Sequence, residues 1–330
     1  MAPTPRRNLH YNGEDTDPLQ PPIFYSGVPK QMHIGIAPPI VVQHPAVVAE
    51  WEAGAGIEDL TRIAETADRL GYHHLTCSEH VAVPTDVAAE RGATYWDPLA
   101  TLGFLAARTS GIRLATQVLV LGYHHPLEIA KRYGTLDAVS GGRLVLGLGV
   151  GSLREEFALL GAHFDDRGPR ADDALAALRA SLSRSRPEYH GSFYDFENVV
   201  VEPHAVQPRV PLWVGGRTLR SLRRAVAFGD GWVPFGLSLD ELCALLGKVE
   251  LPGGFEVILS AGAPLDPIGN PDTVRRALER RRDAGTTIVS ATLASTGAGH
   301  YCEQLGALRQ LGDELGLTFR STSSDDRTQR

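Results

Sequence analysis

The chain has 330 residues, of which 43% are hydrophobic and 22% are charged. These proportions are typical of a globular protein that buries a large core in one or two domains. The formal net charge of −7 argues against a nucleic-acid surface and against binding to an acidic membrane. No apolar run approaches the roughly 20 residues that span a bilayer, so a small molecule is the expected partner.

Cysteine and histidine usage argues against a metal or redox centre made of side chains. Cys77, Cys243 and Cys302 are far apart, odd in number and without a CxxC pair. This pattern favours a reducing compartment, and we expect a cytoplasmic protein. His73 and His74 are adjacent on a predicted strand and should point to opposite faces, so we predict no metal there.

The first 31 residues are polar and rich in proline, which predicts a flexible leader. Met32 opens the first apolar run and is a second candidate start site beside Met1. Strand-like and helical patterns then alternate. Strands are predicted at 32–42, 72–79, 112–121, 144–149, 210–215, 231–235, 255–260 and 287–293, and helices at 57–70, 98–109, 126–140, 171–182, 219–228, 239–249, 271–284 and 301–315.

Eight strand–helix units predict a (β/α)8 TIM barrel, an α/β fold, over residues 32–317. Residues 318–330 are polar and are expected to form a disordered tail. One insertion, from Glu188 to Gln207, alternates like a small hairpin between the fourth helix and the fifth strand. We expect it at the bottom face of the barrel, with its aromatic residues in local packing.

The fourth predicted strand ends in glycines. Gly147, Gly149 and Gly151 recur at the strand period of two, so one face of the strand end lacks side chains. Two interpretations stay open: the glycines let a neighbouring element pack closely, or they leave a bare surface for a flat or anionic ligand. A dinucleotide fingerprint fits poorly, because it needs glycine where Ser152 or Arg154 stands.

A barrel carries its site at the carboxyl ends of its strands. Glu79 and His80 follow the second strand, and no acid pair, GxSxG or HExxH accompanies them. His80 is either a rim residue held by hydrogen bonds or a catalytic group.

Several collinear motifs resemble the bacterial-luciferase-like flavin- and deazaflavin-dependent oxidoreductases, from Met32 to about Leu315. They are Glu79–His80, the P-x-x-x-A-K segment at 126–131, TLDAVSGGRLVLGLGVG at 135–151 with EEF following, QPRVPLWVGG at 207–216 and RAVAFGDGWVP at 224–234. The resemblance implies a barrel that lays its cofactor across the mouth formed by the strand ends, and it implies a homodimer.

The resemblance also implies roles for individual residues. Glu79 and His80 would face the reactive edge of the cofactor ring, and Thr116 and Gln117 would run alongside the ring. Two further sets would hold the cofactor tail and its phosphate: Gly149, Val150, Gly151 and Ser152 after the fourth strand, and the amides of Gly215 and Gly216. Many relatives have tryptophan in place of Ser152 and a small residue in place of Gln117.

Likeness to the deazaflavin-using branch, including EHV at 79–81 and the GYHHP loop at 122–126, favours coenzyme F420 and hydride transfer to or from a small organic substrate. FMN is the alternative and would make the protein a monooxygenase. A cofactor-binding relative without catalysis is a second alternative. A phosphate-binding lyase or isomerase is disfavoured, because Lys131 and Lys248 lie in predicted helices rather than at strand ends.

Overall fold

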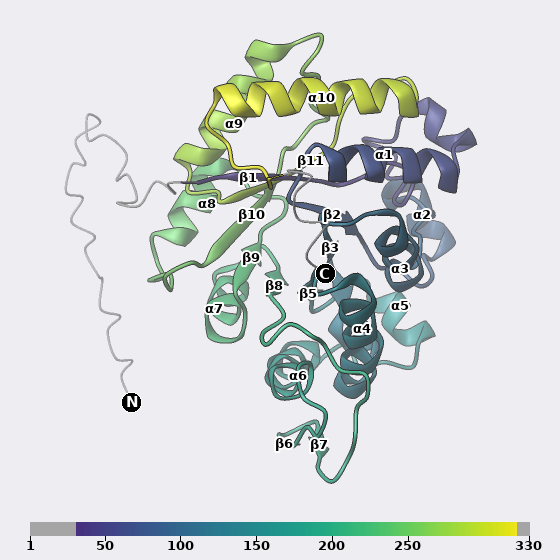
Figure 1. Cartoon of the computed structure of the whole chain (residues 1–330). Helices are drawn as coiled ribbons and strands as arrows, with labels where there is room; N and C mark the ends of the chain where they lie inside the picture. The colour runs from purple at the N-terminus through teal and green to yellow at the C-terminus, as the bar shows by residue number, and fades with distance from the viewer. Residues whose placement is uncertain (1–30, 322–330) are drawn as a thin grey trace, which may run out of the picture.

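A computed structural model describes residues 31–321 as a closed barrel (Figure 1). Its strands are β1 (His33–Ile36), β2 (His74–Cys77), β3 (Arg113–Thr116), β4 (Leu119–Val120), β5 (Leu144–Gly149), β8 (Leu212–Gly215), β9 (Gly231–Val233), β10 (Glu256–Ser260) and β11 (Ile288–Ala291). All barrel pairings are parallel, and the ring closes where β11 pairs with β1 and β3 pairs with β5. The predicted (β/α)8 barrel is confirmed.

Helices surround the ring. They are α1 (Ile57–Arg69), α2 (Thr85–Arg91), α3 (Pro98–Arg108), α4 (Pro126–Ser140), α5 (Arg154–Leu159), α6 (Arg167–Ser181), α7 (Leu219–Phe228), α8 (Leu239–Leu246), α9 (Pro271–Asp283) and α10 (Ala298–Glu314), with 3-10 turns η1 (Glu50–Gly54) and η2 (Leu121–Tyr123). None of the helices within residues 31–321 is long and apolar enough to cross a membrane.

Local sequence explains where these helices begin and end. In α1, Leu60, Ile63, Ala64 and Ala67 are buried at helical spacing, and the chain turns at Gly71 with φ of 80°. α10 lies alongside α1 and covers this side of the barrel (Figure 1). Sequence analysis did not predict α2, because none of its residues is buried and it therefore has no apolar stripe.

The predicted strand at 112–121 is broken in two. β3 ends at Thr116, and the chain bends at Gln117 and Val118, which are joined by a cis peptide bond, before β4 begins. The end of β2 holds this bend: the Ser78 hydroxyl donates to the Gln117 carbonyl (2.6 Å), and the Glu79 amide donates to the Val118 carbonyl (3.2 Å). The bend therefore lies at the carboxyl ends of the strands.

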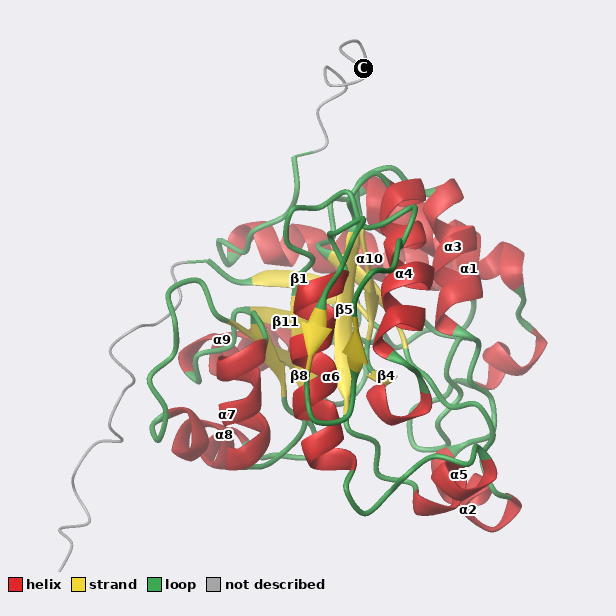
Figure 2. Cartoon of the chain, turned by 90° about the horizontal axis from the view of Figure 1, so that it is seen from below, coloured by secondary structure: helices red, strands yellow, loops and turns green. Residues whose placement is uncertain are grey.

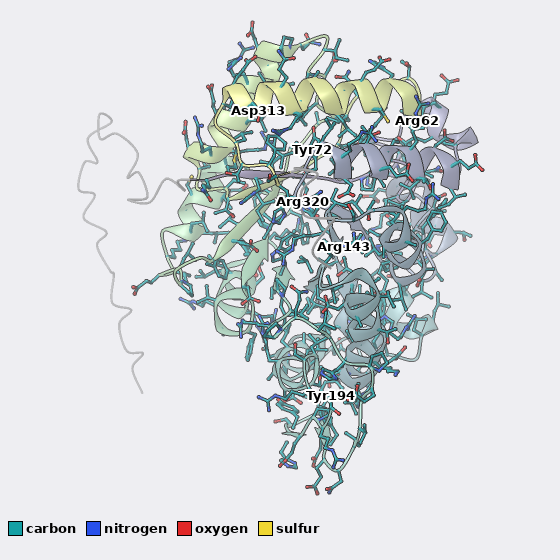
Figure 3. The ribbon with its side chains drawn as sticks, in the orientation of Figure 1. Arg62, Tyr72, Arg143, Tyr194, Asp313 and Arg320 are labelled. Atoms are coloured by element: carbon teal, nitrogen blue, oxygen red, sulfur yellow. The ribbon has the colours of Figure 1, made fainter. Side chains whose placement is uncertain are left out.

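The predicted insertion forms a hairpin of β6 (Tyr189–His190) and β7 (Asp195–Phe196). Its tip is not at the bottom face: Tyr194 packs edge-on against His125, which caps the start of α4 (Figure 3). The Asp173 carboxylate of α6 accepts hydrogen bonds from the backbone amides of Phe193 and Tyr194. The hairpin thus runs outside α4 and α6, and its tip reaches toward the ends where these helices begin. Of its aromatic residues, Phe196 packs against Tyr189 within the hairpin, while Phe193 is exposed beneath the Arg170 guanidinium.

Part of the segment predicted as a tail packs on the barrel. The Thr318 carbonyl accepts from His33 Nδ1 (3.1 Å), and Phe319 packs edge-on against Tyr72 with ring centroids 5.5 Å apart. Arg320 Nη2 lies 2.7 Å from Asp68 Oδ1 (Figure 3). Residues 318–320 therefore belong to the folded body, while the predicted leader up to residue 30 and residues 322–330 lie outside the described chain.

Candidate functional site

The loops after β2, β4 and β5 meet at the carboxyl ends of the strands, which we call the mouth. α2 and α5 lie at this end of the barrel (Figure 2). Hydrogen bonds from the loop before α2 to Glu156 in α5 join the two loops. Because all strands of the ring are parallel, the side chains that follow them gather here.

Glu156 is the centre of this arrangement. Its side chain is fully buried and accepts from His80 Nδ1 (2.7 Å), the Tyr123 hydroxyl (2.8 Å) and the Val81 amide (2.6 Å). Burial alone would raise the pKa of Glu156, but the hydrogen bonds from His80, Tyr123 and the Ala82 amide outweigh it and lower the pKa. Glu156 is therefore a carboxylate at neutral pH.

His80 is consequently held in one orientation. A carboxylate can only accept, so Nδ1 of His80 carries the proton in this bond. The side chain is 19% exposed and packs edge-on against Tyr95, with ring centroids 4.5 Å apart. Within residues 31–321, Nε2 of His80 has no hydrogen-bond partner. This ring nitrogen is available to exchange a proton with a bound molecule.

Glu79 lies differently from the expectation that it faces a cofactor ring. It is 7% exposed, and its carboxylate accepts from the Val120 amide (2.7 Å) and from His124 Nε2 (2.7 Å). Burial lowers the pKa of His124, but the bond and charge of Glu79 raise it by more. Glu79 therefore fixes the segment after the Val118 bend, and both of its oxygens are already used.

The glycines of β5 do not leave a bare surface. A Cβ on Gly147 would lie 2.1 Å from the Thr116 carbonyl oxygen, and one on Gly149 would lie 2.6 Å from the Val118 side chain. The space beside Gly151 is filled by Phe157 and Val120. Of the two interpretations left open by the sequence, close packing of a neighbouring segment is the correct one. The glycine run therefore carries no argument for a ligand.

The two residues expected beside the ring have different positions. Thr116 is fully buried, and its hydroxyl donates to the Gly147 carbonyl (2.7 Å), so its side chain joins β3 to β5 and does not line the mouth. Gln117 and Val118 are partly exposed at the bend. The bend therefore lies partly exposed at the strand ends and packs on the glycines of β5.

The segments expected to hold a phosphate are only partly suited to it. The Gly216 amide already donates to the Val233 carbonyl (3.2 Å), and its backbone has φ of 148° where a Cβ would clash with Ser221. Gly215 lies in β8 against Val118. The first turn of α7 follows, and Arg217 and Arg220 are exposed beside it.

The loop after β5 is held by contacts with the core and with α6. Val150 packs against the core, and the Gly151 carbonyl accepts from Arg167 Nε (3.2 Å), whereas Ser152 is exposed. A cavity of about 530 Å³ follows this loop. It is lined by Arg154, Ala158, Ala162, His163, Phe164, Asp165 and Asp166, so it does not include His80.

His73 and His74 lie close together, contrary to the expectation that they point to opposite faces. His73 and His74 do not diverge: their Nδ1 atoms lie 3.1 Å apart, because His73 precedes β2 and is not held to the strand's alternation. Within the described chain, one exposed group has the spacing of metal ligands, formed by Glu188, His190 and Glu197 beside the hairpin.

Sequence analysis missed the role of Glu156 and Tyr123. Glu156 lies in the EEF that follows the glycine run, but nothing in a single sequence shows that it turns back to His80 in a loop 76 residues earlier. Tyr123 was visible only as part of a loop after a strand end.

Comparisons with known proteins agree with this geometry. The family model described as luciferase-like monooxygenase matches residues 32–250. An uncharacterised protein of Mycobacterium tuberculosis is 30% identical over 231 residues, covering 66% of this chain and 82% of that protein. The oxygenase component of a flavin-dependent trigonelline monooxygenase from Acinetobacter baylyi is 27% identical over 195 residues, which are 58% of this chain and 52% of that protein.

Solved structures with the same fold include a monooxygenase and an F420-dependent reductase. Monooxygenase RslO1 from Streptomyces bottropensis has a TM-score of 0.72 at 23% identity and covers 86% of this chain and 100% of its own. The coenzyme F420 dependent tetrahydromethanopterin reductase from Methanopyrus kandleri has a TM-score of 0.65 at 16% identity and covers 85% and 98%. The chain belongs to the luciferase-like monooxygenase family.

Proposed function

We propose that this protein is an F420-dependent oxidoreductase in which His80 exchanges a proton with a small organic substrate during hydride transfer. The observation that carries the proposal is the 2.7 Å bond between His80 Nδ1 and the buried Glu156 carboxylate. It leaves Nε2 as the group that can give or take a proton at the mouth. A general acid or base needs this combination of fixed orientation and access.

The residues at the mouth fit a planar, anionic cofactor. The partly exposed Gln117–Val118 bend would support the ring, and Arg217, Arg220 and the first turn of α7 would attract the phosphate of the tail. The exposed Ser152 hydroxyl, in the loop after β5, is a further donor. When bound, the deazaflavin supplies the two-electron hydride chemistry.

The remaining charged groups would position the site. Glu79 holds Val120 and His124 and thereby the bend, while Glu156 joins the loops after β2 and β5. Both carboxylates are buried and use their oxygens inside the protein, so neither would contact the substrate. His80 alone among these residues combines access with an unused nitrogen.

An FMN-dependent monooxygenase is the second candidate, supported by the likeness to the trigonelline monooxygenase component and to RslO1. The cofactor retained by the protein after expression in a host that makes both F420 and flavins would separate the two. We expect the absorption and fluorescence spectrum of F420. A retained spectrum of FMN alone would favour the monooxygenase. Cofactor retention without turnover of any acceptor would favour a non-catalytic relative.

A further inference from the structure

A line of polar side chains passes through the interior of the barrel to the mouth. His74, at the start of β2, is fully buried, and its imidazole lies over β1 where a Cβ on Gly35 would be only 2.2 Å away. Gly35 pairs in register with Ser290 of β11. A glycine at this point of β1 therefore makes the room that lets His74 reach across to Ser290.

The donor and the acceptor of each hydrogen bond in this line can be assigned. The Ser290 hydroxyl donates to Gln117 Oε1 (3.2 Å), and it lies 3.0 Å from His74 Nε2. Because the serine has a single proton, it must accept from His74, which is therefore protonated on Nε2. His74 Nδ1 then accepts from Nδ1 of His73, 3.1 Å away.

Both histidines are suited to this neutral arrangement. Burial, and then the charge of Arg113, lowers the pKa of His74 to about 3. Burial also lowers the pKa of His73 well below its usual value. Neither imidazole carries a charge at neutral pH, so each offers one donor and one acceptor, as the line requires.

The line ends on an amide with an unused donor. The backbone of Gln117 is fixed by bonds to Cys77 and Ser78, and Oε1 of its side chain is fixed by Ser290. Nε2 has no partner among residues 31–321, and Gln117 as a whole is partly exposed at the bend. An amide held on one side and open on the other is preorganised to bind an acceptor.

We propose that Ser290 and His74 orient the Gln117 carboxamide so that Nε2 donates a hydrogen bond to a ring oxygen or nitrogen of the bound cofactor. This inference rests on the proposed function, because it assumes that a planar redox cofactor occupies the mouth. Gln117 is then a cofactor-binding residue, and Ser290 and His74 are positioning residues that act from inside the barrel.

A double-mutant cycle on cofactor affinity tests the inference. Of F420 and FMN, the one that wild type binds more tightly is titrated into wild type, Gln117→Leu, Ser290→Ala and the double variant. We expect Gln117→Leu to weaken binding about 3- to 10-fold and to shift the visible absorption band, since one hydrogen bond to the ring is lost. Ser290→Ala should weaken binding about threefold, and Ser290→Thr, which keeps the hydroxyl, should restore it.

The decisive result is the double variant. In the Gln117→Leu background, Ser290→Ala should cause no further loss of affinity, because its effect passes through the amide. Ser260→Ala removes a serine that pairs in register with Ser290 on β10 and should leave affinity unchanged. Two results would overturn this inference but not the proposed function: additive losses of affinity in the double variant, or wild-type affinity and spectrum in Gln117→Leu. Failure of wild type to bind either cofactor would overturn the proposed function as well.

Discussion

At the scale of single residues, the mouth depends on one buried carboxylate. Glu156 gathers a histidine, a tyrosine hydroxyl and backbone amides from another loop, and it leaves His80 with one exposed nitrogen. His80 stood out in the sequence because it follows a strand, whereas the family resemblance implied the same role for Glu79. The difference between the two is burial and bonding, which only the folded chain reveals.

The first prediction concerns His80. Replacement by alanine should lower turnover about 10²- to 10⁴-fold, the usual contribution of a general acid or base, while cofactor affinity stays near wild type. Single-turnover hydride transfer measures the loss, and fluorescence titration measures the affinity. His204→Ala, on the exposed insertion, serves as the control. Full turnover in His80→Ala with intact binding would refute its role.

The second prediction concerns Glu156. Glu156→Ala leaves the Val81 amide and the Tyr123 hydroxyl without their acceptor, so the free energy of unfolding should fall by about 2–4 kcal/mol at pH 7. Urea denaturation measures this change. The neighbouring exposed residue gives the matched control, since Glu155→Ala should change stability by less than about 0.5 kcal/mol. Equal stability of both variants would contradict the account.

At the scale of elements, the glycines of β5 leave the space that the bend after β3 fills. The alternating glycines were visible in the sequence, but the segment that occupies their empty face was not. The apolar run at 112–121 predicts a single strand, and only the bonds from Ser78 and Glu79 show where it bends. Long-range contacts of this kind have no local signal.

The third prediction follows from this packing. In Gly147→Ala the new methyl group would meet the Thr116 carbonyl at 2.1 Å, so backbone must move and stability should fall by about 1–3 kcal/mol or more. Gly306→Ala in α10 meets nothing within 4 Å and should be neutral or stabilising by up to about 1 kcal/mol. Chemical denaturation of both variants makes the comparison. A Gly147→Ala protein as stable as wild type would show that the face is open.

At the scale of the whole molecule, the alternation of strands and helices was enough to predict the barrel and its order. Apolar periodicity reports which elements exist, and parallel strands joined by helices allow few topologies. The polar interior was not predicted, because adjacent histidines on a strand were expected to diverge. The packing of Phe319 and Arg320 on the barrel was not predicted either, because a polar C-terminal segment has the composition of a solvated tail.

The fourth prediction is a dependence of stability on pH. Burial lowers the folded-state pKa of His73 and His74. Below pH 6.5, the ordinary pKa of histidine, these two side chains therefore bind protons in the unfolded chain but stay neutral in the folded one. Stability should therefore fall with decreasing pH, by about 1.4 kcal/mol per pH unit for each histidine once pH is well below that value. The slope comes from unfolding free energies at pH 6 and pH 5.

The matched variants are His74→Asn, which should reduce this slope by one histidine's share, and His204→Gln, at a partly exposed position on the insertion, which should keep it. His33 and Arg113 lie near His73 and His74, and their positive charge also lowers the pKa of these two histidines. An unchanged slope in His74→Asn would mean that the imidazole is protonated in the folded barrel.

The most direct test of the account is a titration of purified wild-type protein with F420 and, separately, with FMN, followed by cofactor fluorescence. The account predicts saturable binding of one F420 per chain at micromolar or lower concentration, weakened by Gln117→Leu and unaffected by His204→Ala. Saturation by neither cofactor would contradict the claim that the mouth of this barrel holds a planar redox molecule.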